Sequence, residues 1–417
     1  MYGDRQSEPM RLLVVSQYFW PENFNINDLV TELARRGHEV TVLTGEPNYP
    51  RGEIFSQYVS DKSAFSWHDG AEVIRVPLRP RHQGKLNLTL NYLSFVLSAS
   101  FWGPLKLHRR HFDVIFVYQI SPATVFLPAL LLKLIKRTPM TFWVLDLWPH
   151  SLSAVGAVRS STVLGLVDVL MRLIYRCADL VLVQSHGFMN EIARQAGDKA
   201  KIRYFPSWSD NKSSETSAVP APEVPKANGV FSIMFTGNIG FAQDFPAILD
   251  TAELLWNEPV RWLIVGDGQR SDWLANEITQ RNLSERILLL GQYPSERIPS
   301  FLLHADAGLV TLRSEPAFAM TIPRKVQTYL AACKPILAMI DGEGGEVVRA
   351  AKAGFVSPAG DAPAFASTVR KMMATSPDHR TEMGLNGQNF ARREFDKNKL
   401  VDRLETWLEE LTRQNKS

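Results

Sequence analysis

The sequence contains the stretch Thr321-Ile-Pro-Arg-Lys-Val-Gln-Thr-Tyr-Leu-Ala-Ala-Cys-Lys-Pro335, which is followed at once by the apolar run Ile336-Leu-Ala-Met-Ile340. The spacing predicts a helix that begins at a proline turn and ends before Lys334-Pro335, and then a strand. Arg324 and Lys325 stand in the first helical turn, where backbone N–H groups point outward, so the pattern indicates an anion site. The anion that fits an α/β protein of this size is a nucleotide diphosphate. The alternative is a pair of surface cations at the start of a helix.

The size and composition of the chain are those of a globular protein. Its 417 residues suffice for two or three domains with buried cores, and 45% of them are apolar. The net charge of +3 gives no reason to expect a nucleic-acid partner. Two cysteines, Cys177 and Cys333, are expected inside separate helices; they have no zinc or disulfide spacing, which fits a reducing cytosol. We expect neither a signal peptide nor a transmembrane helix, because no apolar run reaches about 18 residues.

The first half of the sequence alternates strands and helices. A strand over Arg11 to Gln17 is followed by a helix with Ile26, Leu29 and Leu33 on one face, and Gly37 is expected to cap its end. Further strands are expected at Glu39 to Thr44, Val73 to Val76, Val114 to Val117, Met140 to Leu145 and Leu180 to Val183. Strands that are apolar throughout and are separated by helices predict a parallel sheet that is covered on both faces.

The second half repeats the α/β pattern after a change of composition. Residues 207–229 are rich in Ser, Pro and charge, which is typical of a linker. Strands are then expected at Val230 to Phe235, Trp262 to Val265, Ile287 to Leu290, Ala307 to Val310 and Ile336 to Ile340, with a charged amphipathic helix over Asp396 to Leu411. We predict an N-terminal domain over residues 1–206, a linker over 207–229, a C-terminal domain over 230–392 and a helical C-terminal segment over 393–417. Ligands of two such doubly wound domains bind at the carboxyl ends of the strands.

A set of motifs along nearly the whole chain matches a known family. They are Val14-Val-Ser-Gln-Tyr-Phe-Trp-Pro-Glu-Asn-Phe24, Leu33-Ala-Arg-Arg-Gly-His-Glu-Val-Thr-Val-Leu43, Asp146-Leu-Trp-Pro-His-Ser-Leu152, Phe235-Thr-Gly-Asn-Ile-Gly240, Val265-Gly-Asp-Gly268, Leu290-Gly-Gln-Tyr-Pro294, Ala305-Asp-Ala307 and Pro323 to Pro335. In this order the chain resembles the family 4 retaining glycosyltransferases of the GT-B fold, in particular bacterial enzymes of O-antigen and colanic-acid-type polysaccharide synthesis. The resemblance implies two doubly wound, Rossmann-like α/β domains that face each other across a cleft.

The resemblance also implies a donor site in the C-terminal domain. Its expected members are Gly237, Asn238, Gly240, Gln243, Gly266, Gln292, Tyr293, Arg324, Lys325 and Thr328. Glycines after a strand let the backbone approach phosphates closely, and the alternative at Gly237 to Gly240 and at Gly266 is a structural turn. Lys325 matches the family lysine that stabilises charge on the departing nucleoside diphosphate, which makes it a catalytic residue.

The sequence departs from the family pattern at several donor positions. Many relatives carry an Arg and a Lys where this chain has Asn238 and Gln243, so Lys325 and Arg324 are expected to supply more of the positive charge. The two family glutamates fall on Met320 and Thr328, and both are therefore missing. The nearest acids are Glu315, Glu343 and Glu346, and the sequence does not decide whether one of them substitutes.

On the acceptor side, the catalytic candidate is Asp146, which follows a predicted strand. Its expected role is to position the acceptor hydroxyl or to take its proton, and the alternative is a helix-capping Asp. The resemblance adds Glu22 and Asn23 in the loop after the first strand, with Asn23 and Asn25 as alternative helix caps. It also adds His150, where relatives often carry an acid. We expect no metal site and no cofactor, since the nucleotide-sugar is a substrate.

Residues 86–111 predict a helix with an unusual distribution of side chains. One stripe holds Leu86, Leu90, Leu93, Leu97 and Phe101, and another holds Asn87, Asn91, Ser94 and Ser98. Gly103-Pro104 is expected to break the helix before a basic cluster over 106–111. An apolar helix beside basic residues is a candidate for contact with an anionic membrane. The alternative is a helix packed on the sheet, with its neutral polar face in solvent.

The function expected from the resemblance is transfer of a sugar from a nucleotide-sugar donor to a polyprenyl-linked saccharide, with retention of configuration. The expected donor is a UDP-sugar. This activity places the protein in the cytoplasm, with peripheral contact at the inner face of the cell membrane. Two alternatives stay open from the sequence. They are a non-catalytic sugar-nucleotide-binding subunit of a polysaccharide assembly complex and a nucleotide-sugar epimerase.

Overall fold

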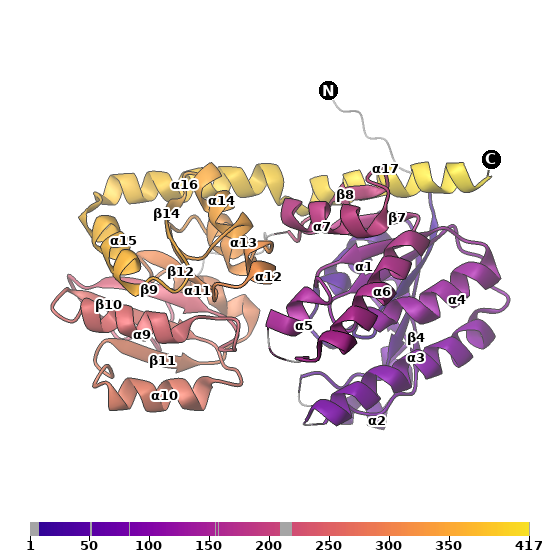
Figure 1. Ribbon diagram of the computed structural model, residues 1–417, viewed down its shortest axis with the longest axis horizontal. Coiled ribbons are helices and arrows are strands. Elements are labelled where there is room, and N and C mark those ends of the chain that lie inside the picture. The colour runs from indigo at the N-terminus through magenta and orange to yellow at the C-terminus, as the bar shows by residue number, and fades with distance from the viewer. Residues whose placement is uncertain are drawn as a thin grey trace. The chain divides into compact units, whose positions relative to one another are not determined.

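The computed structural model describes residues 8–50, 52–82, 84–154, 156, 158–208 and 219–416. Internal contacts divide the chain into a first unit, Met1–Phe205 with Asn398–Ser417, and a second unit, Pro206–Lys397 (Figure 1). The division falls one residue before the boundary expected from the sequence. Part of the expected linker belongs to the second unit, because Ala221 and Val224 are buried in its core.

The first unit is built on a sheet with eight strands among the described residues. Their order is β3-β4-β2-β1-β5-β6-β7-β8, and every neighbouring pair is parallel except β3 with β4. The strands are β1 (Arg11–Val15), β2 (Glu39–Gly45), β3 (Trp67–His68), β4 (Ala71–Val76), β5 (Val114–Gln119), β6 (Met140–Val144), β7 (Leu180–Val183) and β8 (Ile202–Tyr204). The parallel sheet expected from the apolar runs is confirmed, whereas β3 and β8 are too short and too polar to have been recognised.

Helices cover both faces of this sheet. They are α1 (Asn25–Arg35), α2 (Ser56–Ser60), α3 (Lys85–Leu107), α4 (Phe126–Lys136), α5 (His150–Ala154), α6 (Ser161–Cys177), α7 (His186–Ala196) and α17 (Lys397–Lys416). The connections from β4 to β5, β5 to β6 and β6 to β7 all step the same way across the sheet. Because such crossovers are right-handed, α3, α4 and α6 lie on one face, and α1, whose connection steps the other way, lies on the opposite face (Figure 1).

Two local expectations in this unit are wrong. Helix α3 continues through Gly103 and Pro104 to Leu107, because a proline in the last turn removes only one hydrogen bond. Gly103 permits close packing there, since a Cβ atom would stand 3.1 Å from Cδ2 of Leu43. At the start of α1 the N-cap is Phe24 without a side-chain hydrogen bond, so neither Asn23 nor Asn25 caps the helix.

The C-terminal helix α17 is bound to the first unit by a cluster of charged groups. Nε2 of His38, which is buried, lies 2.8 Å from Oε1 of Glu405, while Nδ1 accepts a hydrogen bond from the backbone N–H of Met10. The guanidinium of Arg36 contacts both Glu405 and Asp402. These contacts explain why the last twenty residues belong with the N-terminal sheet.

The second unit has a sheet of six parallel strands among the described residues, in the order β11-β10-β9-β12-β13-β14. The strands are β9 (Phe231–Thr236), β10 (Val260–Val265), β11 (Ile287–Gly291), β12 (Ala307–Thr311), β13 (Ile336–Met339) and β14 (Gly354–Ser357). The helices are α9 (Phe245–Leu254), α10 (Ser271–Gln280), α11 (Ile298–Leu302), α12 (Pro316–Ala319), α13 (Arg324–Ala331), α14 (Glu343–Ala350), α15 (Ala362–Ala374) and α16 (Pro377–Glu394). The doubly wound α/β fold expected for each half is confirmed.

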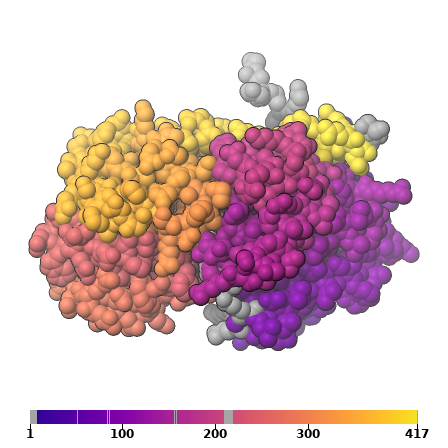
Figure 2. Space-filling view, in the orientation of Figure 1, coloured from indigo at the N-terminus to yellow at the C-terminus, as the bar shows by residue number. Residues whose placement is uncertain are grey.

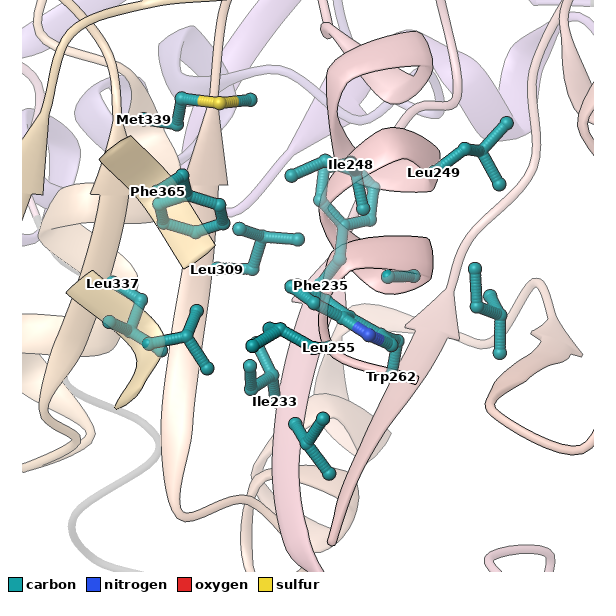
Figure 3. Packing of buried hydrophobic residues seen from close by; sticks show 14 of the residues in the cluster. Ile233, Phe235, Ile248, Leu249, Leu255, Trp262, Leu309, Leu337, Met339 and Phe365 are labelled. Atoms are coloured by element: carbon teal, nitrogen blue, oxygen red, sulfur yellow. The ribbon is translucent and has the colours of Figure 1, made fainter. Parts of the chain in front are cut away.

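The core of the second unit fixes β9, which leads into the candidate site. Phe235 of β9 packs among Trp262, Leu309 and Phe365 from two neighbouring strands and α15 (Figure 3). Cys177 ends α6, but Cys333 lies after the end of α13 with φ of 56°, so the expectation that it lies within a helix is wrong. None of the described helices is long and apolar enough to cross a membrane.

Candidate active site

Three glycines bring the loops after β9, β10 and β11 together at one edge of the second sheet. Gly237 N–H donates to the carbonyl of Val265 at 2.8 Å, and Gly266 N–H donates to the carbonyl of Gly291 at 2.8 Å. A Cβ atom on Gly266 would stand 1.8 Å from the carbonyl oxygen of Gly237, and its φ is 152°. Gly266 is therefore required for the approach of two backbones. Both predicted turns lie at the edge where parallel α/β sheets bind ligands.

The remaining residues of the first loop hold its shape. The side-chain Oε1 of Gln243 accepts a hydrogen bond from Gly240 N–H at 3.1 Å. The Asn238 side chain lies against both Gly240 and Gly268, where added Cβ atoms would approach it to 2.5 Å. Gln243 therefore stabilises the turn, and Asn238 packs against it.

Lys325 is placed against this loop by the first turn of α13. Its Nζ lies 4.5 Å from the centroid of the Phe235 ring, and its Cε and Nζ are 3.3 and 3.5 Å from the position of a Cβ on Gly237. Among the described residues no carboxylate lies within ion-pair distance of Nζ. Burial lowers the pKa of this lysine to about 8. A half-buried cation without a carboxylate, beside a glycine turn, is suited to receive an anion.

The other residues of the α13 motif take separate positions. Arg324 is exposed, and the hydroxyl of Thr328 donates to the Arg324 carbonyl at 3.0 Å. The hydroxyl of buried Tyr329 lies against the end of β9, where it accepts from Thr236 N–H at 2.9 Å and donates to the carbonyl of Met234. Tyr329, which the sequence motif contained without an assigned role, thus locks α13 onto β9 and positions Lys325.

The segment after β11 provides the remaining donor candidates. Gln292 is exposed directly after Gly291. Tyr293 is partly buried, its ring 4.5 Å from that of Phe301 and 5.3 Å from the guanidinium of Arg297. The side chain of Tyr293 is therefore engaged in packing, which leaves the backbone and Gln292 as the accessible groups of this segment.

Two arginines that sequence reasoning missed are bound to the glycine loop. Arg270 N–H donates to the carbonyl of Ile239 at 3.0 Å, and its guanidinium lies 3.6 Å from the Trp273 ring centroid. Arg313 N–H donates to the carbonyl of Ala242 at 2.9 Å. Burial and the charge of Arg313 both lower the pKa of Arg270. The sequence could have indicated these two arginines, because both follow a strand, β10 or β12. Residues at the carboxyl ends of parallel strands lie at the same edge of the sheet.

In the first unit, Asp146 lies directly after β6. Its carboxylate accepts a hydrogen bond from Nε1 of Trp148 at 3.2 Å and interacts with the hydroxyl of Ser121. Its backbone carbonyl accepts from the side chain of Gln119 at 3.0 Å. Burial raises the pKa of Asp146, which makes its carboxylate a stronger base than a solvated one. The carboxylate also interacts with the hydroxyl of Ser151 in the first turn of α5, a contact that fits the helix-cap alternative as well.

The other acceptor-side candidates differ in how available they are. The buried carboxylate of Glu22 accepts three backbone N–H bonds, from Phe19, Asn48 and Tyr49, and burial raises its pKa to about 7. Glu22 therefore braces two loops and has little capacity left for a ligand. Asn23 is exposed, and Nε2 of His150 lies 3.2 Å from Glu191. The carboxylate of Glu191 therefore lies beside His150.

Among the described residues, no group of three or more His, Cys, Asp or Glu side chains has an arrangement that could hold a metal ion.

Comparison with known proteins identifies the family. The chain matches the Glycosyl transferase 4-like domain over residues 25–208 and the Glycosyl transferases group 1 family over residues 222–390. WcaI of Escherichia coli (strain K12), named as a colanic acid biosynthesis glycosyl transferase, is 25% identical over 345 residues, which cover 77% of this chain and 81% of WcaI. WbjE of Pseudomonas aeruginosa, named as a glycosyltransferase, is 29% identical over 234 residues, which cover 53% of this chain and 57% of WbjE.

The fold is also that of solved structures. HepE of Anabaena in complex with UDP and glucose is 15% identical, with a TM-score of 0.67 over 96% of this chain and 99% of HepE. The chain belongs to the family 4 glycosyltransferases. It is a retaining enzyme of the GT-B fold that uses a nucleotide-sugar donor, and the resemblance found in the sequence is thereby confirmed.

Proposed function

We propose that the enzyme transfers a sugar from a UDP-linked donor to a lipid-linked saccharide in the synthesis of a cell-surface polysaccharide. The observation that carries the donor assignment is Lys325, a cation without a carboxylate partner among the described residues, held against Gly237. The complexes of HepE contain UDP, and WcaI is named for colanic acid biosynthesis, which supports the choice of nucleotide and process.

In this proposal the second unit holds the diphosphate. Backbone at Gly237 and Gly240 approaches the phosphates, and Lys325 stabilises the negative charge that develops as the bond to the sugar breaks. Arg324 and Thr328, at the start of the same helix, are donor contacts of lesser weight, and Gly266, Gln292 and Tyr293 border the nucleotide. Lys325 takes the electrostatic role without a metal ion, so we expect turnover to persist in a chelating buffer.

In the first unit, Asp146 accepts the proton of the acceptor hydroxyl. Its raised pKa suits that task, because a base is most effective when its pKa approaches the working pH. Attack and departure on the same face of the donor then give retention without a protein nucleophile. Asn23 and the His150–Glu191 pair lie at the same edge as acceptor-side contacts.

The experiment is transfer of radioactive sugar from a panel of UDP-sugars into the organic phase of a bacterial lipid extract. Wild type is expected to use one donor, and Asp146→Asn is expected to lower turnover by about 10²- to 10⁴-fold while its UDP affinity stays unchanged. A wild-type enzyme that transfers no sugar from any UDP donor, but does so from a GDP-sugar, would overturn the nucleotide assignment.

We further propose that residues 86–111 contact an anionic membrane at its cytoplasmic face. In the structure α3 turns its apolar stripe outward, with Leu86, Leu97 and Phe101 at least 62% exposed, and turns Asn91 into the interior. The packed-helix alternative required the opposite orientation. Of the 21 large apolar side chains that are exposed in the described part of the chain, 12 lie on α3, α4 and α6. The atoms of this part of the first unit, purple in Figure 2, form much of its surface in that view.

Charge supports the same surface. Residues 85–177 contain ten Lys and Arg but only three acids, and Arg110, Lys133 and Arg172 are paired with Glu72, Asp179 and Asp168. Basic residues still outnumber acids along this segment when these ion pairs are counted. Basic residues around an apolar face favour an anionic bilayer. We expect flotation with phosphatidylglycerol vesicles that weakens with salt and in Leu97→Glu, but not in the control Leu385→Glu on α16. Equal flotation with neutral and anionic vesicles would contradict the electrostatic part.

A further inference from the structure

The segment between β4 and α3 carries two arginines at the carboxyl edge of the first sheet. The guanidinium of Arg81 lies 5.4 Å from the centroid of the Tyr49 ring, and Nη2 of Arg79 donates to the side chain of Asn87 at 3.0 Å. Among the described residues, neither guanidinium lies within ion-pair distance of a carboxylate. The two positive charges are thus available to a ligand.

A network of three buried amide side chains holds this segment in place. Gln17, Asn48 and Asn91 are each at most 3% exposed. The side chain of Asn91 accepts from Gln17 at 2.7 Å and donates to the carbonyl of Arg79 at 2.6 Å, while Asn48 Oδ1 accepts from Arg81 N–H at 3.1 Å. Buried polar groups are costly unless bonded, and together they specify one local conformation. The network therefore preorganises the backbone that carries Arg79 and Arg81.

The side chain of Tyr92 connects Arg81 with the acceptor-side base. The positive charge of Arg81 acts to lower the pKa of the Tyr18 and Tyr92 phenols, and the charge of Asp146 acts to raise the pKa of Tyr92. The Tyr92 side chain also interacts with the hydroxyl of Ser121. Ser121 interacts with the Asp146 carboxylate, and it lines a small pocket with Gln17 and Tyr18. Cation and base are thus connected through a few side chains at one edge of one unit.

We propose that Arg81, with Arg79 beside it, binds the phosphate group that joins the acceptor saccharide to its lipid. The inference rests on the proposed function, and it adds the chemical class of the acceptor, a lipid phosphate or diphosphate. Guanidinium groups bind phosphate oxygens in pairs, and the Tyr49 ring stabilises the planar cation from one side. Helix α3, whose outward residues Leu86 and Leu97 face solvent, begins directly after the arginines. A phosphate at Arg81 would lie between the lipid chain along α3 and the saccharide at Asp146.

The test uses the full-length protein with the additional substitution Lys325→Ala, which removes the proposed donor diphosphate site. The probe is farnesyl diphosphate in phosphatidylcholine vesicles, and farnesol is its uncharged counterpart. We expect Arg81→Gln to raise the Kd of farnesyl diphosphate about tenfold, which is about 1.4 kcal/mol, and to leave farnesol partitioning unchanged. Arg81→Lys keeps the charge but not the paired hydrogen-bond geometry of a guanidinium. Its Kd for farnesyl diphosphate is expected to lie between those of the parent protein and of Arg81→Gln. Arg403→Gln, which removes an exposed arginine on α17 outside the proposed membrane contact, is the matched control and should behave as the parent protein.

Three results would overturn the inference. The first is an unchanged Kd in Arg81→Gln, and the second is an equal loss for farnesol, which would make the arginine a general membrane contact. The third is displacement of the probe by inorganic pyrophosphate or by phosphatidylglycerol at similar concentrations, which would assign the site to free phosphate or to bulk headgroups. Failure of the proposed function is seen separately, as absence of sugar transfer by the wild-type enzyme, and does not alter this binding measurement.

Discussion

Replacing Lys325 by Met is expected to stabilise the second unit while it weakens donor binding. The ammonium group lies 4.5 Å from the Phe235 ring and has no carboxylate within ion-pair distance among the described residues. Burial disfavours its charged form, so the pKa is lowered to about 8 from the ordinary value of 10.5. Methionine keeps the length and the contacts of the chain without the charge.

The size of the effect follows from the two pKa values. Between pH 8 and pH 10.5 the unfolded chain binds more protons at this lysine than the folded one, so stability rises with pH across that window. The loss of folding stability caused by the buried charge is therefore at its full value below about pH 8 and disappears above about pH 10.5. A difference of about 2.5 pKa units corresponds to about 3 kcal/mol at most. Because the side chain is partly exposed, about 1–3 kcal/mol is expected at pH 7.

The assay is thermal unfolding of wild type and Lys325→Met at pH 7 and pH 10, with and without UDP. At pH 7 the variant should unfold about 2–12 °C higher, since a unit of this size gains about 2–4 °C per kcal/mol. The gain should shrink at pH 10, and UDP should raise the midpoint of the wild type by more than that of the variant. Lys352→Met, at an exposed position of the same unit, is the control. A variant that is no more stable than wild type at pH 7, or equally stabilised at both pH values, would refute the reasoning.

Three further substitutions test the packing that positions the site. Gly266→Ala brings a Cβ within 1.8 Å of the Gly237 carbonyl oxygen, so we expect loss of UDP binding by calorimetry and a clearly lower thermal midpoint; normal UDP affinity would contradict the proposed backbone approach. Tyr329→Phe leaves Thr236 N–H without its partner, and urea unfolding should show a loss of about 1–2 kcal/mol, whereas no loss would mean that water replaces the hydroxyl. Glu405→Gln weakens the contacts that bind α17, so limited proteolysis should release the C-terminal helix faster than in wild type; equal rates would assign α17 docking to its apolar face.

Much of the fold was predictable because buried parallel strands leave a direct record in the sequence. Runs such as Leu180 to Val183 are apolar at every position, which is typical of a parallel strand that is buried on both faces. The two sheets, most strand positions and the helix after Pro323 followed from such runs. Strands β3 and β8 were not predicted, because runs of two or three partly polar residues show no periodic pattern.

The orientation of α3 could not be read from periodicity alone. Its two stripes are equally regular, and the usual rule places the apolar one inward. The structure turns Asn91 inward because Gln17 and the carbonyl of Arg79 provide partners for it, and these are distant in sequence. A buried polar stripe becomes recognisable only when its partners are placed in space.

The candidate site was found in part for a similar reason. Lys325 and Gly237 are recognisable because each belongs to a local motif, and the structure brings them into contact. Arg270 and Arg313 follow strands without a motif, and only the hydrogen bonds of their backbone to the glycine loop show that they belong there. Glu22 shows the converse, since an acid at the expected place is already occupied by three backbone N–H groups.

The most direct test of the central claim is release of UDP from a panel of UDP-sugars, with bacterial lipid extract as acceptor. Wild type, Lys325→Ala and the exposed control Lys352→Ala are compared at pH 7, where the lysine is expected to be charged. We expect wild type and Lys352→Ala to release UDP from one UDP-sugar, and Lys325→Ala to release it at a rate lower by about 10²- to 10³-fold. Release by Lys325→Ala at the wild-type rate would contradict the assignment of this lysine to the departing diphosphate.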